Sequence, residues 1–350
     1  MHLLFITQKV DRADWLLGFT HGWLQALAAC VERLTVICLA QGETDLPPNV
    51  KVISLGKERG VSRIGRAIGF ARTLAATIGE ADGVLAHMSP IFAIAAAPFA
   101  RKRRLPLVLW YTHRNVDFKL RLATALCDAV VTASPESFQL PTPKLHVLGH
   151  GIDPQLFFPL PEKERPGRRG EPPLILAVGR LSPIKRYELL IEAVKRLRMH
   201  GMNVRCVIAG GDPPGGRTCG DSLRAMGAGV VEFLGSVPHT QIAAWYHQCS
   251  VAVNLCPTGG LDKVVLEAMF CGCPVVVTNR SFAPLLGEEG GPWLVAEEAG
   301  SIADALASIL ANSQQAQTER VRERALAEHR LEGLIERLLT VFGDSIAKKK

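Results

Sequence analysis

One glutamate, Glu267, lies inside a short apolar helical pattern in the segment TGGLDKVVLEAMFCGCPVVVTN, residues 258–279. The residues three and four positions from it on a helix are mostly apolar, so its carboxylate would lie close to buried strands. Such a carboxylate could accept hydrogen bonds from two hydroxyl groups, for example those of a ribose. The alternative is an ordinary ion pair with Lys263, although lysine before glutamate is the weaker order of that pair.

Two glycines and an aspartate come directly before this helix. Gly259 and Gly260 would let the backbone approach a ligand closely. A helix that starts at Asp262, or in the loop before it, presents unpaired N–H groups, and these favour an anion such as a phosphate.

A second segment, GRLSPIK, has residue types that suit a diphosphate. It begins with Gly179 and Arg180, directly after the apolar run LILAV. Ser182 and Pro183 are typical of an N-cap and a first helical turn, so we expect a helix to begin there. Arg180 and Lys185 would then flank a helix N-terminus, and two cations beside it could hold a diphosphate. The alternative is that both are ordinary surface cations.

The first half of the chain offers His113 and Gly18, each placed after an apolar run. The ring of His113 titrates near neutral pH and could form hydrogen bonds with a substrate, whereas most lone histidines are structural. Gly18 could border a ligand or serve as a turn residue in a solvated loop. The chain has no HExxH, GxSxG or Walker motif and no close pair of carboxylates, so nothing indicates a hydrolase.

The elements that would position these residues are short apolar runs that alternate with amphipathic helical stretches. Continuous apolar strands between helices are typical of a parallel sheet covered on both faces. The runs are residues 3–7, 34–40, 51–55, 83–88, 107–113, 128–134 and 145–151, then 174–179, 204–211, 230–235, 251–256 and 274–279. The proline-rich and charged loop 159–173 separates the two sets. In open parallel sheets ligands bind beyond the carboxyl ends of strands, where most of the candidate residues lie.

The composition agrees with two folded domains. The chain has 350 residues, of which 48% are hydrophobic and 21% are charged, so buried cores are expected and disorder is not. Nine cysteines without a CxxC pair indicate core residues in a reducing cytosol, and they argue against a disulfide framework or a zinc site. We expect no signal peptide and no spanning helix, and therefore a soluble or peripheral protein.

The net charge of +7 comes partly from basic runs at 101–104, 163–169 and 348–350. No aromatic ladder accompanies these runs, so we expect no nucleic acid as a partner. Most basic runs are solvated loops or tails. An anionic membrane surface or an acidic polymer is the remaining partner that such charges could attract.

Four motifs together resemble the group 1 glycosyltransferases, also called family 4, over nearly the whole chain. The motifs are GHGIDPQLFFP (149–159), AVGRLSPIKRYELLIEAV (177–194), the long segment 233–279 and WYTH with ATALCDAVVTASPESF (110–138). The resemblance implies the α/β GT-B architecture, with two Rossmann-like doubly wound parallel-sheet domains that face a central cleft. It divides the chain into an acceptor-side domain (1–155), a linker (156–172), a nucleotide-sugar domain (173–326) and a C-terminal helix and tail (327–350) that packs back toward the first domain.

The resemblance also implies a function and a set of site residues. The function is transfer of a hexose from a UDP- or GDP-sugar to a glycan, lipid-linked or other acceptor, with retention and without a metal or cofactor. Such enzymes act in polysaccharide or glycolipid biosynthesis, and we expect a cytoplasmic protein that contacts the inner face of the membrane peripherally. Arg180 and Lys185 would hold the diphosphate, Glu267 the ribose and His113 the donor hexose. The residues that would surround donor or acceptor are Gly18, Gly179, Gly259, Gly260, Leu261, Asp262 and Lys263.

One departure from the family pattern concerns Gly259, which stands where the family has a first glutamate, eight positions before Glu267. Asp262 is expected to take over contacts to the sugar hydroxyls. The same departure keeps two other functions open: a nucleotide-sugar epimerase on the same fold, and a noncatalytic nucleotide-sugar-binding protein.

Overall fold

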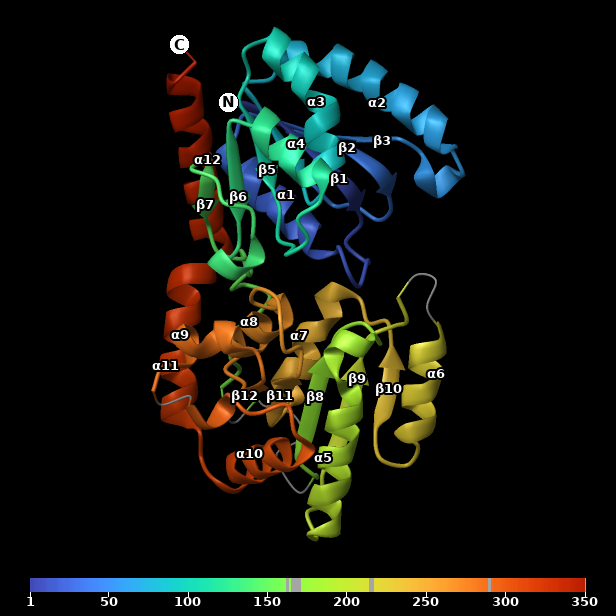
Figure 1. Cartoon of the computed structure of the whole chain (residues 1–350), viewed down its shortest axis with the longest axis vertical. Helices are drawn as coiled ribbons and strands as arrows, with labels where there is room; N and C mark the ends of the chain where they lie inside the picture. Colours follow the sequence, from blue (N-terminus) through green and yellow to red (C-terminus); the bar gives the residue numbers. More distant parts are fainter. Residues whose placement is uncertain (162–163, 165–170, 214–216, 289–290, 350) are drawn as a thin grey trace. The chain divides into compact units, whose positions relative to one another are not determined.

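The structure is a computed structural model that describes residues 1–161, 164, 171–213, 217–288 and 291–349. Contacts between residues divide the chain into two compact units (Figure 1). Unit 1 contains Met1–Gly151 and His329–Lys350, and unit 2 contains Ile152–Glu328. Of the 17 residues of the predicted linker 156–172, eight lie outside the described residues, and they include the basic run 163–169 except for Glu164.

Unit 1 is built on a seven-stranded sheet in the order β3-β2-β1-β4-β5-β6-β7, and every neighbouring pair is parallel. Because both faces are covered by helices, its central strands are continuous apolar runs. The strands are β1 (His2–Val10), β2 (Arg33–Gln41), β3 (Val50–Ser54), β4 (Gly83–His87), β5 (Leu107–Trp110), β6 (Ala129–Thr132) and β7 (Leu145–Val147).

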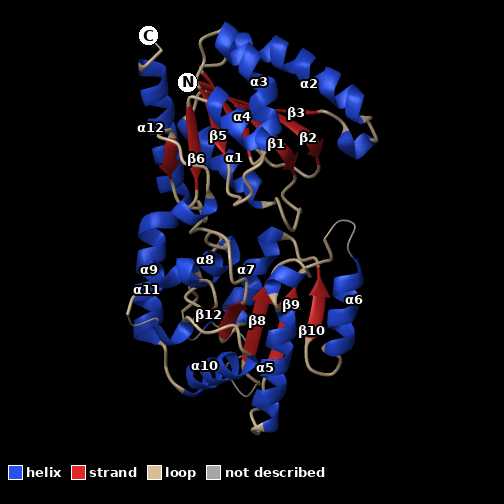
Figure 2. Cartoon of the chain, viewed as in Figure 1, coloured by secondary structure: helices blue, strands red, loops and turns tan. Residues whose placement is uncertain are grey.

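The helices of unit 1 form two layers (Figure 2). Leu3 and Phe5 of β1 face a core shared with α1 (Phe19–Cys30) and α12 (Leu331–Ala347). Leu4 and Ile6 point the other way, because side chains alternate along a strand. They face a core formed by the layer of α2 (Arg63–Thr77), α3 (Pro90–Lys102) and α4 (Phe118–Leu126).

Unit 2 is built on a five-stranded parallel sheet in the order β10-β9-β8-β11-β12. The strands are β8 (Leu174–Val178), β9 (Arg205–Ala209), β10 (Glu232–Gly235), β11 (Val251–Asn254) and β12 (Val275–Val277). The helices are α5 (Tyr187–Met199), α6 (Arg217–Met226), α7 (His239–Gln248), α8 (Lys263–Phe270), α9 (Ala283–Leu286), α10 (Ala299–Ala311) and α11 (Gln315–His329). Helix α5 packs against α6 and α10, whereas α7 packs against α8.

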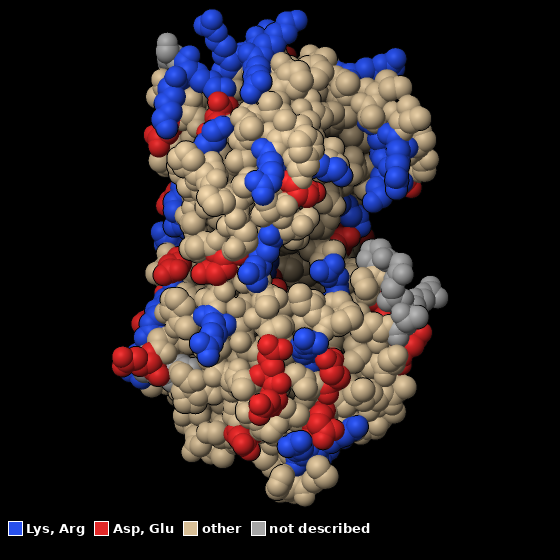
Figure 3. Space-filling model, in the orientation of Figure 1, with Lys and Arg blue, Asp and Glu red and all other residues tan. Residues whose placement is uncertain are grey.

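These two sheets confirm the predicted fold class, and each of the twelve predicted strands corresponds to an observed one. Seven of the nine cysteines are buried and all nine are free thiols, as expected for core residues. No helix among the described residues is long and apolar enough to cross a membrane. Lys and Arg side chains are spread widely over the visible surface of unit 1 (Figure 3).

The two chain segments that leave unit 1 lie side by side. The backbone N–H of His150 donates a hydrogen bond of 3.3 Å to Nδ1 of His329. Burial lowers the pKa of His329 to about 4, so the ring is neutral at pH 7 and Nδ1 can accept this bond. Next to it, Trp23 donates a hydrogen bond of 3.2 Å from its indole Nε1 to the carbonyl of Gly151.

Gly151→Ala is expected to destabilise unit 1 by about 1–3 kcal/mol. Gly151 has a φ of 67°, and an added Cβ would lie 2.4 Å from Leu334 Cδ2, on the buried face of α12. Thermal or urea unfolding measures the effect. Gly22→Ala, in α1, is the matched control, because nothing lies within 4 Å of the new Cβ and a helical alanine is favoured. Equal stability of Gly151→Ala and Gly22→Ala would contradict the inference that only glycine fits at position 151.

Candidate active site

The candidate residues of unit 2 follow three neighbouring strands of its sheet. Strands β8, β11 and β12 are adjacent, and all run in the same direction. Gly179 comes directly after β8, Asn254 is the last residue of β11, and Asn279 follows β12 by two residues. The carboxyl ends of parallel strands meet at one edge of a sheet, so the loops that follow them lie together.

The segment after β8 differs from the helix start that the sequence predicts. Pro183–Lys185 forms a single 3₁₀ turn, and Arg186 then adopts a left-handed conformation with a φ of 51°. The α-helix begins only at Tyr187, and the Ser182 side chain caps neither the turn nor the helix. The prediction of a helix that begins at Ser182 and Pro183 was therefore wrong, and Arg180 and Lys185 lie in a loop before α5.

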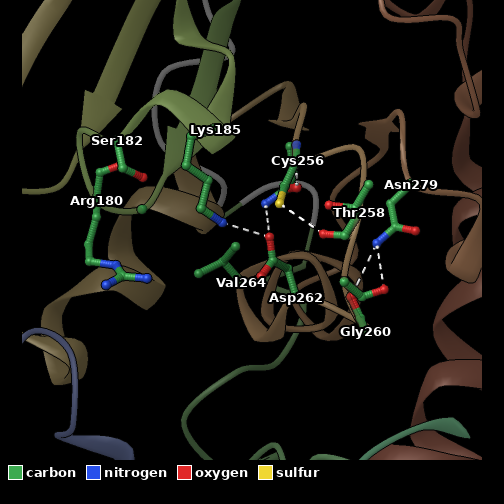
Figure 4. Close-up of polar contacts among 12 residues, drawn as sticks. Arg180, Ser182, Lys185, Cys256, Thr258, Gly260, Asp262, Val264 and Asn279 are labelled. Carbon is green, nitrogen blue, oxygen red and sulfur yellow. Dashed lines mark hydrogen bonds and ion pairs between the residues drawn. The ribbon is translucent and has the colours of Figure 1, made fainter. Parts of the chain in front are cut away.

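Lys185 is held by a short ion pair with Asp262, the residue that precedes α8. The distance from Lys185 Nζ to Asp262 Oδ2 is 2.6 Å, and Figure 4 shows the lysine directed toward this carboxylate. The side-chain amide of Asn254 donates a second hydrogen bond, of 2.9 Å, to the same oxygen. The Lys185 side chain is only 12% exposed, so the cation has one well-defined position. These contacts join the loops after β8 and β11.

Gly179 is required for this arrangement. Its φ is 146°, and an added Cβ would lie 3.1 Å from both Lys185 Cε and the Tyr187 hydroxyl. That hydroxyl donates a hydrogen bond of 3.0 Å to the Gly179 carbonyl, and this bond links the start of the loop to the first residue of α5. Arg180 is exposed and leaves the same loop, to one side of the Lys185 contact in Figure 4. The loop therefore carries one mostly buried cation, Lys185, and two exposed cations, Arg180 and Arg186.

The glycine loop before α8 is held by Asn279. Its side-chain amide donates hydrogen bonds to the carbonyls of Gly259, at 3.4 Å, and Gly260, at 3.2 Å. Gly259 has a φ of 121°, which a residue with a side chain rarely adopts. Leu261 is buried in the core and anchors the end of the loop. A glutamate at position 259 would thus need a different backbone conformation from the one seen here.

Glu267 lies on α8 and has a partner that the sequence did not indicate. The side chain is 3% exposed, and its Oε1 accepts a hydrogen bond of 2.9 Å from His239 Nε2, at the start of α7. Burial lowers the pKa of the half-buried Lys263 to about 7, and the nearby carboxylate of Glu267 opposes this shift. Glu267 follows Asp262 by five residues, which is about 7.5 Å along the helix axis. Unit 2 therefore brings Lys185 into contact with Asp262, and it places Glu267 further along the helix that follows Asp262.

The two candidates of the first half belong to unit 1. His113 is exposed in the loop after β5, and its ring contacts Tyr111 edge to face at 5.5 Å between centroids. Gly18 is the residue before α1, and its N–H donates a hydrogen bond of 3.0 Å to the Asp14 carbonyl. Both residues thus follow strands of the unit 1 sheet. The sequence predicts this position, beyond the carboxyl ends of the strands.

Sequence reasoning missed His239, Asn254, Asn279 and Tyr187 as supports of this site. A signal was available for the two asparagines, because each ends or follows a buried apolar run, where polar residues are rare. His239 follows Val237 and Pro238 and had no such pattern. No three His, Cys, Asp or Glu side chains are grouped as metal ligands among the described residues.

Comparison with known proteins gives one family match, and it lies within unit 2. Residues 172–312 match the family model of glycosyl transferases group 1. A similar curated protein is the GDP-mannose-dependent alpha-(1-6)-phosphatidylinositol monomannoside mannosyltransferase of Mycolicibacterium smegmatis, 29% identical over 195 residues, or 50% of each chain. Another is the D-inositol 3-phosphate glycosyltransferase of Mycobacterium marinum, 26% identical over 53% of this chain and 41% of that protein. The chain thus matches about half the length of these relatives.

Solved structures share the fold of the whole chain. The Anabaena protein Alr3699/HepE, in complex with UDP and glucose, has a TM-score of 0.75 and 18% identity, over 97% of this chain and 99% of that one. WaaG, a glycosyltransferase involved in lipopolysaccharide biosynthesis, has a TM-score of 0.66 and 17% identity, over 97% and 99%. Residues 172–312 therefore match the group 1 glycosyltransferases, and the whole chain has the GT-B fold.

Proposed function

We propose that this protein is a retaining, metal-independent glycosyltransferase that moves a hexose from a UDP- or GDP-sugar to a glycan or lipid-linked acceptor. One observation in the structure carries the proposal. Lys185 and Asp262 come from the loops after two different strands and form an ion pair, and Glu267 lies five residues after Asp262 on α8. A fixed cation, a helix start and a buried carboxylate are the groups that a diphosphate and a ribose would need.

Each residue has a proposed role in the reaction. Transfer breaks the bond between the anomeric carbon and a diphosphate oxygen, so negative charge grows on the departing diphosphate. Lys185 and Arg180 would stabilise this charge, and backbone N–H groups near Gly260 and Lys263 would bind the phosphates. Glu267 would accept hydrogen bonds from the ribose hydroxyls through Oε2, because Oε1 is bonded to His239.

Asp262 is proposed to replace the missing glutamate at Gly259 in part. Both observed contacts of its carboxylate, with Lys185 and Asn254, are accepted by Oδ2. Oδ1 would then accept a hydrogen bond from a sugar hydroxyl of the donor. From unit 1, His113 would contact the donor hexose and Gly18 would border the acceptor, as the family resemblance implies.

The donor nucleotide and its sugar have two candidates, which come from two of the similar proteins. The mycobacterial relative is named for GDP-mannose and a phosphatidylinositol mannoside, whereas the Anabaena protein was solved with UDP and glucose. The proposal therefore includes both nucleotides. It also includes both kinds of acceptor, and we propose that the protein acts in the cytoplasm in polysaccharide or glycolipid biosynthesis.

A nucleotide panel tests the proposal. We expect UDP or GDP, but not both equally, to raise the melting temperature, because a ligand at 100 times its Kd adds about 2.7 kcal/mol to stability. The matching nucleotide sugar should then be consumed with release of the free nucleotide diphosphate. Isomerisation of the sugar without an acceptor would instead identify an epimerase. Donor binding with neither hydrolysis nor transfer would identify a noncatalytic binder.

A further inference from the structure

Asp262 occupies the N-cap position of α8 but does not cap the helix. Aspartate is among the preferred capping residues, because its carboxylate can accept hydrogen bonds from the first N–H groups of a helix. Among the described residues, which include all of α8, the Asp262 side chain forms no such bond. Instead, its Oδ2 accepts hydrogen bonds of 2.6 Å from Lys185 Nζ and 2.9 Å from Asn254 Nδ2 (Figure 4). The carboxylate therefore binds the loop after β8 and not its own helix.

Asn254, the last residue of β11, holds the carboxylate of Asp262 in this position. Asn254 is buried, and its Oδ1 accepts a hydrogen bond of 3.2 Å from the backbone N–H of Cys256. Its NH₂ group therefore faces the other way, toward Asp262. Because an NH₂ group can only donate, the atom opposite it has to be an acceptor. The end of β11 thus positions the Asp262 carboxylate independently of Lys185.

The ion pair reduces the attraction of this site for anions. The side chains of Lys185 and Asp262 are only 12% and 34% exposed, so salt and water screen their charges less than those of a surface pair. At a distance the two opposite charges largely cancel. At close range the Lys185 ammonium can still bind a phosphate oxygen, because it has more N–H donors than the one that Asp262 uses. A phosphate bound there would lie beside the carboxylate, which would repel it.

We propose that Asp262 is an internal counter-ion that competes with the diphosphate for Lys185 and so weakens the binding of the nucleoside diphosphate product. The inference rests on the proposed function, in which Lys185 binds the diphosphate of the donor.

The charge of the diphosphate changes during the proposed reaction. Transfer breaks the bond between the anomeric carbon and the terminal phosphate oxygen, and the electron pair stays on that oxygen. The terminal phosphate of the product then carries a further negative charge near neutral pH, which it lacks in the donor. A carboxylate fixed beside Lys185 would therefore repel the product more strongly than the donor. Asp262 would thus favour release of the product over release of the unreacted donor.

Calorimetric titration of the full-length Asp262→Asn variant with UDP and GDP tests the inference. Asparagine keeps the size of the side chain and can still accept hydrogen bonds from Lys185 and Asn254, but it has no charge. The nucleoside diphosphate that the wild type prefers should bind this variant about tenfold more tightly, because a like charge beside the phosphate is removed. The corresponding nucleoside, which has no phosphate, should bind both proteins alike. In steady-state kinetics the same diphosphate should inhibit the variant more strongly than the wild type.

Asp262→Glu and Asp304→Asn are the matched controls. Glutamate retains the negative charge, so Asp262→Glu should bind the nucleoside diphosphate no more tightly than the wild type. Asp304 is exposed on α10, outside the strand-end loops, and Asp304→Asn makes the same change in net charge. This variant should bind the nucleotide like the wild type. Asp262→Ser also removes the charge and should tighten binding in the same way, so it repeats the test if Asp262→Asn has a lowered melting temperature.

A parallel titration of Lys185→Ala separates this inference from the proposed function. If Lys185→Ala weakens binding of the nucleoside diphosphate but the neutral Asp262 variants do not tighten it, the counter-ion role is overturned and the proposed function stands. Tighter binding of the nucleoside as well would also overturn that role, since the effect would not depend on the phosphates. If Lys185→Ala leaves the affinity unchanged, Lys185 does not bind the diphosphate, and both proposals about this residue are wrong.

Discussion

Lys185→Ala is expected to lower kcat by about 10²–10³-fold, the usual effect of removing one preorganised group that stabilises charge in a transition state. Lys185 is the fixed cation of the site, at 2.6 Å from Asp262 and mostly shielded from water. Its charge would act on the diphosphate as the sugar leaves, when the negative charge is largest. Steady-state kinetics with the donor identified by the nucleotide panel measure the loss.

Two further variants separate catalysis from structure. Arg196→Ala removes an exposed cation of α5, paired with Glu192 at 3.6 Å, and should leave kcat unchanged. Asp262→Asn keeps the shape of the residue before α8 and the charge of Lys185, so we expect a loss of less than about tenfold. If Lys185→Ala and Asp262→Asn lost activity and melting temperature to the same extent, Lys185 would be an anchor of the loop. Its charge would then have no direct role in transfer.

Glu267→Ala is expected to weaken nucleotide binding by about 10- to 150-fold, since hydrogen bonds to a charged group contribute roughly 1.5–3 kcal/mol. The buried carboxylate would bind the ribose diol, so the effect should appear in the affinity for the free nucleotide as well as for the donor. Calorimetric titration with the matching nucleoside diphosphate measures it. The His239→Ala variant should lose less, because the proposed role of this histidine is to orient Glu267, to which it is hydrogen-bonded.

The 2′-deoxynucleotide gives this prediction a sharper readout. Wild-type protein should bind the deoxynucleotide more weakly than the ribonucleotide, whereas Glu267→Ala should bind both alike. A double-mutant cycle with His239→Ala then measures the coupling of the two side chains. Unchanged discrimination between ribose and deoxyribose in Glu267→Ala would show that the carboxylate has no contact with the sugar, whatever its effect on stability.

The strands could be predicted from the sequence because of how these sheets are buried. A parallel strand covered on both faces, such as β8 or β12, is apolar at nearly every position, and this signal is local. The order of the strands is not local, since β8 pairs with β9 and β11, which lie far apart in sequence. The strand order therefore could not be predicted from the sequence.

The helix start after β8 could not be predicted by the same means. Ser182 and Pro183 have the residue types of an α-helix start, but they begin a 3₁₀ turn here. Arg186 then takes a positive φ that nothing in its side chain favours. Two contacts with residues outside this turn accompany the conformation: the Lys185 ion pair with Asp262 and the hydrogen bond from Tyr187 to Gly179.

The candidate residues were easier to find than their partners. Glu267 and Lys185 are visible as charged residues in unusual places, within an apolar helix and after a buried strand. Their partners are remote: His239 lies 28 residues before Glu267, and Asp262 lies 77 residues after Lys185. A single sequence has no local pattern that connects positions so far apart.

Unit 1 is formed by two separate segments of the chain, and this has a consequence for its folding during translation. Its core includes Leu334, Leu338 and Phe342 of α12, which the ribosome adds only after all of unit 2. Unit 2 is one continuous segment and can fold while translation proceeds. The apolar face of residues 1–151 that packs against α12 stays uncovered until α12 has been synthesised. During that delay the nascent chain would expose Trp23 and Leu27 of α1, and a holdase chaperone would be expected to recognise them first.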